Sequence, residues 1–315
     1  MIISVALLAL QIVSPQEISL ESLELKSAQL AWNKRDPIRQ GVTRLIEQDK
    51  LKSASDFRRA ADLFAPVGFP QRYFLLFPTS QIWYELNLTA LGMGDTNAIE
   101  NIAKAYDVFH MSLGKGQRFG TRRLPEEEFS GSPFEYFPAH KSIRNVILNP
   151  VQALRAATIS QDNEELFKLS EADTSDRITE GVTSEQRDRN DLTRIKRVLA
   201  ILNTDKVRTS RDFLNACLVL QHGKGNGTHF YAHESALCAA ILSRNIEKKE
   251  GKKLFWNSLA LLSMSYDRLL QSSGHFQRFG TQFEGKVSIT GINDFQRDIA
   301  RVPPLAEQPK RGTTD

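Results

Sequence analysis

The chain has 315 residues, of which 41% are hydrophobic and 25% are charged, with a formal net charge of +4. This composition is typical of a globular protein of roughly two domains. The isoelectric point near 9.0 is mildly basic. However, basic and acidic residues are interleaved and form no run of five or more like charges. We therefore expect a solvated mixed-charge surface and no nucleic-acid partner.

The N-terminal segment is apolar over residues 2–13 and continues as Ser14-Pro15-Gln16. This length suits the hydrophobic region of a signal peptide and is too short to span a bilayer. No Lys or Arg precedes the run, and no small-x-small cleavage site follows it. We predict an apolar segment over residues 1–16 and an exported or periplasmic protein without a further membrane span. The alternative is a buried N-terminal element of a cytoplasmic protein.

The first half, residues 20–158, carries helical signals. Ser53 stands three residues before Asp56, the spacing of a capping box, and an apolar segment follows as far as Phe64. A second helix ends at Gly114, a position that favours a left-handed C-cap. Its apolar face is predicted to be formed by Ile99, Ile102, Tyr106, Phe109 and Leu113. Downstream, residues 129–147 predict a loop with a short hairpin.

Residues 159–192 are rich in Ser, Asp, Glu, Thr and Arg and poor in apolar residues, so we predict a polar linker. The second half, residues 193–307, repeats the earlier signals. Thr209 and Asp212 have capping-box spacing, and a second helix ends at Gly274. Its face is predicted to be formed by Phe255, Leu259, Leu262, Tyr266 and Leu269. Residues 283–292 predict another short hairpin, and residues 308–315 a disordered tail.

One motif occurs in both halves: Tyr-Asp, six residues, Gly, two residues, and Gln-Arg-Phe-Gly-Thr, at 106–121 and 266–281. A second similar pair of segments precedes it, at 49–57 and 205–213. Two blocks kept in the same order predict a tandem duplication. We expect a mainly α protein of two related helical-hairpin domains with short β-hairpins or loops after each Gly-Thr. The alanine-rich segment 231–241 makes the hairpins loosely similar to tetratricopeptide repeats, although no 34-residue period is present.

The polar residues of the motif are complete only in the second half. Gln221-His222-Gly223 replaces Ala65-Pro66-Val67, Arg268 replaces Val108, and Gln282 replaces Arg122. We therefore expect the site in the second half and treat the first as degenerate. The candidate site residues are Gln221, His222, Asp267, Arg268, Gln277, Arg278, Thr281 and Gln282.

Two roles are open for the Gln-Arg-Phe-Gly-Thr-Gln loop. Glutamine amides both donate and accept, and an arginine can hold a carboxylate or phosphate with two donors, so the loop suits a peptide or a small polar ligand. Alternatively, Gln277 and Thr281 tie the helix exit to the core. In either case we predict a positive φ at Gly280.

His222 also has two interpretations. It can cap the carbonyls at the end of a helix, or it can act as a general acid or base that Asp267 orients. His222, His229 and His233 lack the spacing of a zinc-protease helix, so we expect neither metal nor cofactor. Cys217 and Cys238 are expected to be buried free thiols, with a disulfide as the alternative.

The second half resembles an uncharacterised bacterial helical domain family, a domain of unknown function. The resemblance depends on Gln-His-Gly at 221–223, Asp-Arg at 267–268, Gln-Arg-Phe-Gly-Thr-Gln at 277–282 and Pro-Pro-Leu-Ala-Glu at 303–307. It covers about residues 195–307, with a degenerate copy at about 36–150. The resemblance implies a helical domain and supplies no activity.

Two functions follow as hypotheses. The first is a binding or interaction protein that presents the second loop to a peptide or small polar ligand. The second is an enzyme, a hydrolase or transferase, in which His222 is the base, Asp267 orients it, and Arg268 or Arg278 binds an anionic group.

Overall fold

The computed structural model describes residues 18–31, 34–66, 77–121, 138–224, 226–244, 249–308 and 313–314. Within them the protein is mainly helical, as the sequence predicts. The apolar segment over residues 1–16, Arg122 and residues 129–137 of the hairpin predicted over 129–147 lie outside the described residues. The rest of that hairpin does not form, because Lys141–Leu148 is an α-helix. No helix in the described ranges is both long and apolar enough to cross a membrane.

The described residues before 160 form seven α-helices. They are α1 (Leu20–Ala28), α2 (Asp36–Glu47), α3 (Ala54–Phe64), α4 (Phe77–Gly92), α5 (Ala98–Ser112), α6 (Lys141–Leu148) and α7 (Pro150–Ile159). Six more follow: α8 (Glu164–Ile178), α9 (Ser184–Leu202), α10 (Ser210–Leu220), α11 (Asn226–Ser243), α12 (Lys249–Ser272) and α13 (Asp294–Ile299). Two short strands complete the described chain, β1 (Val287–Ser288) and β2 (Thr313–Thr314).

The predicted capping boxes form at the starts of α3 and α10. Ser53 Oγ accepts from the Asp56 amide, and Thr209 Oγ1 accepts from the Asp212 amide. In each box the carboxylate also accepts from the amide of the capping residue, so two otherwise free donors are satisfied together. Gly114 and Gly274, which follow α5 and α12, have φ values of +70° and +80°.

The segment with the sequence character of a linker, residues 159–192, contains α8 and the first half of α9. Asn163 caps α8, and Thr183 and Gln186 form a capping box at the start of α9. Few apolar residues are needed here because the buried face of α8 includes Ser170 and Asp173. Polar contacts between α8 and α9 take the place of a hydrophobic stripe.

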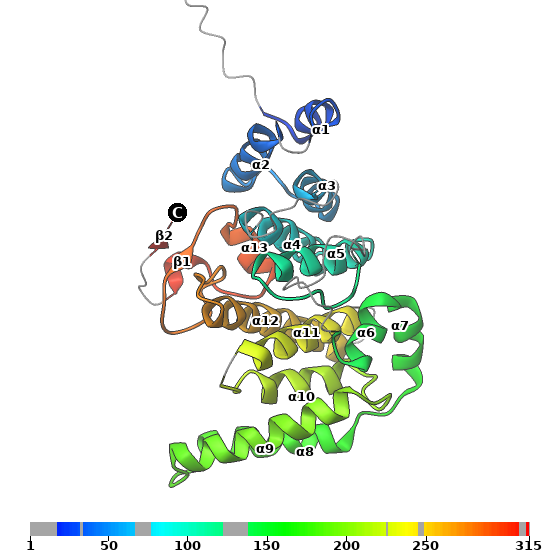
Figure 1. Cartoon of the computed structure of the whole chain (residues 1–315), viewed down its shortest axis with the longest axis vertical. Helices are drawn as coiled ribbons and strands as arrows, with labels where there is room; N and C mark the ends of the chain where they lie inside the picture. The colour runs from blue at the N-terminus through cyan, green and yellow to red at the C-terminus, as the bar shows by residue number, and fades with distance from the viewer. Residues whose placement is uncertain are drawn as a thin grey trace, which may run out of the picture.

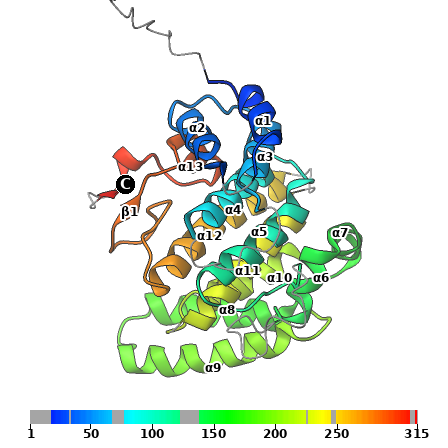
Figure 2. The same cartoon turned by 45° about the horizontal axis from the view of Figure 1, so that its top comes forward.

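The helices are stacked in layers (Figure 1). α1–α3 form one end, α4 and α5 with α13 come next, α11 and α12 follow, and α10, α8 and α9 form the other end. The turned view shows α9 along the lower edge and the α6–α7 hairpin at the side (Figure 2). A single cluster of buried apolar residues extends from Leu20 to Val302, so the two halves share one core.

A helix near the end of each half packs on the other half. α6 lies against α11, and α13 lies against α4. Hydrogen bonds add further contacts between the halves: Ser142 at the start of α6 donates to the Thr204 carbonyl after α9, at 2.6 Å, and Asn293 before α13 donates to the Ile46 carbonyl on α2, at 2.7 Å. Each half therefore packs against a helix that the other half contributes.

The second predicted hairpin does not form. β1 follows Thr281 as expected, but it pairs in parallel with β2 at residues 313–314. A hairpin requires an antiparallel neighbour joined by a tight turn, whereas this partner comes from the segment for which the sequence predicts a disordered tail. Residues 309–312 and 315 of that tail lie outside the described residues.

Candidate functional site

The Gln-Arg-Phe-Gly-Thr loop of the second half folds around the carboxylate of Asp267. One oxygen accepts from the Arg278 and Phe279 amides, at 2.7 and 3.1 Å, and the other from the amide and hydroxyl of Thr281, both at 2.8 Å. Gly280 has φ +78°, as predicted, which lets the chain turn back onto the carboxylate.

The first half has the same arrangement. Asp107 accepts from the Arg118, Phe119 and Thr121 amides and from the Thr121 hydroxyl, at 2.7–2.9 Å. Burial raises the pKa of both Asp107 and Asp267, while these hydrogen bonds oppose the shift. The contacts favour the structural interpretation of the five-residue motif, in which it ties the helix exit to the core.

The arginines of the two loops reach into opposite halves. Arg278 forms a two-pronged ion pair with Glu85 of α4, with both contacts at 2.8 Å. Arg118 forms the corresponding pair with Glu234 of α11, at 2.6 and 2.9 Å. All four residues are buried. Arg278 is therefore occupied inside the protein and is not presented to a ligand.

Between the two ion pairs lies a cluster of buried rings. The Tyr84 hydroxyl is 2.7 Å from Nε2 of His233, and both rings pack on Tyr106 and Tyr266. Burial lowers the pKa of His233 to about 3. The His233 ring is thus neutral in the folded protein and belongs to the core.

Four of the predicted site residues do come together. The Arg268 guanidinium donates from Nε to the Gln282 Oε1, at 2.8 Å, and from Nη1 to the Gln221 carbonyl, at 2.5 Å. His222 follows Gln221 directly in the turn after α10. Arg268 therefore joins α12, the second loop and the end of α10.

His222 does not bond to Asp267, which corrects the predicted pairing. Its Nδ1 lies 3.0 Å from Oδ2 of Asp173 on α8. Asp267 is fully buried and engaged on both oxygens by its own loop, so it cannot orient the ring. The sequence did not indicate Asp173 as the partner of His222, because the two residues stand 49 positions apart and Asp173 lies inside the predicted linker.

Gln277 and Gln282 also bond within the protein. Gln277 donates from Nε2 to the Glu284 carbonyl, at 2.5 Å, and accepts the Gln282 amide on Oε1, at 2.8 Å. Gln282 in turn donates to the Met264 carbonyl, at 3.0 Å. The loop is therefore an internal structure, and its glutamine side chains hold it closed.

Asp173 belongs to an ionic network between α8 and α9. Arg177 contacts Asp173 and Asp191, both at 3.0 Å, and Arg194 contacts Asp191 and Asp176, at 2.7 and 2.8 Å. This network holds the Asp173 carboxylate on the side of the His222 ring that faces α8. Nδ1 of His222 is occupied there, and the other ring nitrogen points away from this carboxylate.

The described residues form neither a disulfide nor a cluster of metal ligands. Cys217 and Cys238 are buried free thiols, and burial raises the pKa of Cys217 to about 12. Among the described residues no group of three or more His, Cys, Asp or Glu side chains is arranged to hold a metal ion.

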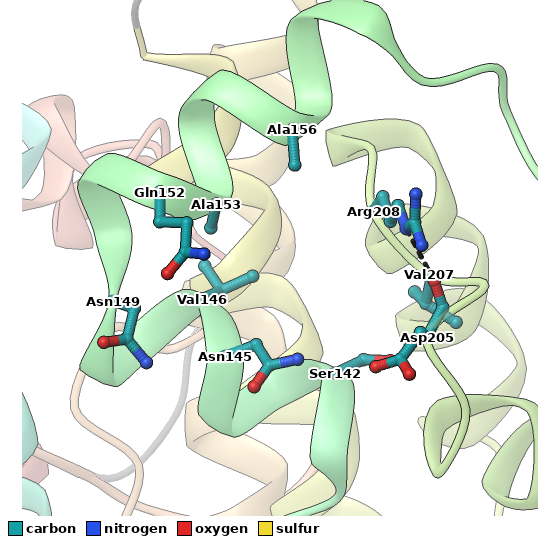
Figure 3. Close-up of a pocket in the computed structure, with 10 residues that line it drawn as sticks. All are labelled: Ser142, Asn145, Val146, Asn149, Gln152, Ala153, Ala156, Asp205, Val207 and Arg208. Atoms are coloured by element: carbon teal, nitrogen blue, oxygen red, sulfur yellow. Dashed lines mark hydrogen bonds between the residues drawn. The ribbon is translucent and has the colours of Figure 1, made fainter.

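A cavity of about 380 Å³ lies between the α6–α7 hairpin and the segment that joins α9 to α10. Figure 3 shows the carboxamides of Asn145, Asn149 and Gln152 on one wall and Asp205 and Arg208 on the other. A second cavity of about 420 Å³ lies between the end of α7 and the start of α10. Both volumes fall within the usual range of ligand pockets.

The helix beside the two cavities, α7, is weakly held. None of its residues is buried, and Val151 and Ile159 are 64% and 88% exposed. Its side chains that do meet the body include the small residues Ala153 and Ala157. The α7 helix thus forms an edge with open space beside it, a feature that the sequence pattern did not single out.

Comparison with known proteins places the chain in no family: no family model, no curated protein and no solved structure matches it.

Proposed function

We propose that this is a binding protein whose ligand is an extended peptide with acidic side chains, held between the α6–α7 hairpin and the α9–α10 segment. The observation that carries the proposal is the set of three exposed carboxamides on one wall of the cavity, Asn145, Asn149 and Gln152. A carboxamide donates and accepts as a peptide group does. A row of them pairs with a peptide backbone whatever its sequence.

The charges at the cavities favour an acidic ligand. The acidic residues there are already paired with cations, Asp205 with Lys141 at 2.6 Å and Asp162 with Arg211 at 3.1 Å. Arg208 uses Nε on the Asp205 carbonyl and keeps its terminal nitrogens for a carboxylate. This location replaces the second Gln-Arg-Phe-Gly-Thr-Gln loop, whose polar groups bond within the protein.

The test is fluorescence anisotropy with a fluorescein-labelled peptide of alternating glycine and aspartate. Alanine at Asn145, Asn149 and Gln152 together is expected to weaken binding by about tenfold or more, and Arg208→Gln to weaken it further. Gln40→Ala, at an exposed amide on α2, is the matched control. Equal binding by the wild type and the triple variant, or no saturable binding, would refute the proposal.

A hydrolase or transferase is the second candidate, and one observation favours it. Asp173 holds Nδ1 of His222 at 3.0 Å, and a carboxylate-oriented imidazole is the arrangement of a general base. His222→Gln would then remove turnover of an ester or phosphoester substrate while the melting temperature stays nearly unchanged. A loss of stability without any turnover in the wild type would assign His222 a structural role.

A further inference from the structure

Arg268 differs in its partners from the buried arginines of the described residues. Arg118, Arg194 and Arg278 are each paired with at least one carboxylate. Arg268 is half-buried, yet its two hydrogen bonds go to neutral oxygens, the Gln221 carbonyl and the Gln282 side chain. The described part of the chain offers it no ion pair, so no carboxylate offsets the partial removal of its charge from water, which costs free energy.

The surroundings of Arg268 add positive charge. Burial lowers the pKa of Arg268, and the charge of Arg177 lowers it further. Burial and the charge of Arg268 likewise lower the pKa of His229 at the start of α11. Asp173, the nearby carboxylate, is already engaged by Arg177 and His222. Among these groups no carboxylate therefore matches the positive charge of Arg268.

The geometry points to a binding site for a small oxyanion, the carboxylate or phosphate group of a small ligand, at the guanidinium of Arg268. Arginine has five N–H donors, and the two hydrogen bonds of Arg268 use one on Nε and one on Nη1. The remaining donors are one N–H on Nη1 and both on Nη2, and these two terminal nitrogens can bind two oxygens side by side. Gln221 and Gln282 hold the guanidinium in place for this contact.

The first half lacks these features. Val108 follows Asp107 where Arg268 follows Asp267, and Ala65 and Pro66 follow α3 where Gln221 and His222 follow α10. The hydrogen bonds from the loop to the aspartate are present in both halves, whereas the arginine and the glutamine side chain that accepts from it, Gln282, occur in the second half alone. The cationic cluster is thus not needed to build the loop.

The Arg268 site is distinct from the cavity proposed to hold the peptide, and it is tested separately. The melting temperature and the heat of binding are measured with inorganic phosphate and with acetate, each against chloride at equal ionic strength. We expect one of the two anions to bind the wild type saturably and to raise its melting temperature. A response to phosphate alone or acetate alone identifies the class of oxyanion.

Arg268→Gln is expected to weaken that binding by at least tenfold. Arg197→Gln, which removes an exposed arginine of α9 with the same change in charge, is expected to leave it unchanged. Arg268→Lys keeps the charge without the paired donors, so it tests the site even if the glutamine variant fails to fold, and it should also weaken binding. Equal anion binding by Arg268→Gln and the wild type, or binding of neither anion to the wild type, would overturn the inference.

Discussion

At the scale of single residues, Asp107 and Asp267 show how a motif can be repeated for structure alone. Each carboxylate collects four donors from one five-residue loop. Hydrogen bonds to a charged acceptor are worth more than neutral ones, about 1.5–3 kcal/mol each. One aspartate side chain therefore makes the same set of contacts with the loop in both halves.

His233 makes stability depend on pH. Its pKa is about 3 in the folded protein, because of burial, against an ordinary value of 6.5. The unfolded chain therefore binds more protons than the folded one between these values, so stability is complete above pH about 6.5 and is lost as the pH falls. In urea titrations between about pH 6 and 4, His233→Gln should lose less stability than the wild type, by about 1.4 kcal/mol per pH unit. Parallel pH profiles of the two proteins would show that the His233 ring becomes protonated and charged as readily in the folded protein as in the unfolded chain.

Gly280 provides a second test at this scale. With φ +78°, an alanine there is strained by about 1–2 kcal/mol, and its Cβ would also displace the Gln308 side chain. Urea unfolding of Gly280→Ala should show that loss. Gly227 is the control, because it lies in the first turn of α11 with open space around it, so Gly227→Ala should be neutral or stabilising. Equal effects at both glycines would contradict the assigned backbone strain.

At the scale of elements, the helices with a clear apolar face could be predicted and the polar ones could not. The spacing of apolar residues indicates α5 and α12 because their faces are buried in the core. Leu166 is buried on α8, but Ser170 and Asp173 share its face. A helix whose buried side chains satisfy one another has no hydrophobic period, so its segment has the sequence character of a linker.

The partners of the site residues could not be predicted for a related reason. Arg278 and Glu85 stand 193 residues apart, and His222 and Asp173 stand 49 apart. A local pattern identifies Arg278 and His222 as unusual but carries no information on what reaches them from another helix. The sequence therefore predicted that Gln221, His222, Arg268 and Gln282 belong together, yet assigned His222 the wrong carboxylate.

The ion pair between the second loop and α4 can be measured by a double-mutant cycle. Arg278→Met leaves Glu85 buried and unpaired, which should cost about 3–5 kcal/mol of the free energy of unfolding. Glu85→Leu should cost a similar amount. The double variant should lose less than the sum, because no lone charge remains. Additive losses in urea unfolding would mean that the two side chains contribute separately and not as a pair.

At the scale of the whole molecule, the sequence predicted a mainly helical protein, and the structure has one. The tandem duplication stays a prediction, although the two loops make matching contacts. The pattern of residues along the sequence does not predict the contacts exchanged between the halves. In these contacts α6 packs on α11, α13 packs on α4, and the arginine of each loop pairs with a glutamate of the other half. Such contacts depend on how two helical units meet, which local propensity does not encode.

This exchange predicts that the halves depend on each other. Residues 18–160 and 161–308, expressed separately, each contain two buried ionic residues whose partners are on the other fragment: Glu85 and Arg118 in the first, Glu234 and Arg278 in the second. Because an unpaired buried charge is costly, neither fragment should unfold cooperatively as a monomer. Mixed, they should form a one-to-one complex with restored helical signal, measured by size-exclusion chromatography and circular dichroism.

The intact protein cleaved once between α7 and α8 is the control, since it keeps both halves and should remain folded. Cooperative unfolding of either fragment alone would contradict the dependence. It would mean that each half folds independently, and that the shared core and the two ion pairs between the halves only hold two folded domains together. Failure of the nicked protein to stay folded would instead place the requirement on the continuous chain between α7 and α8.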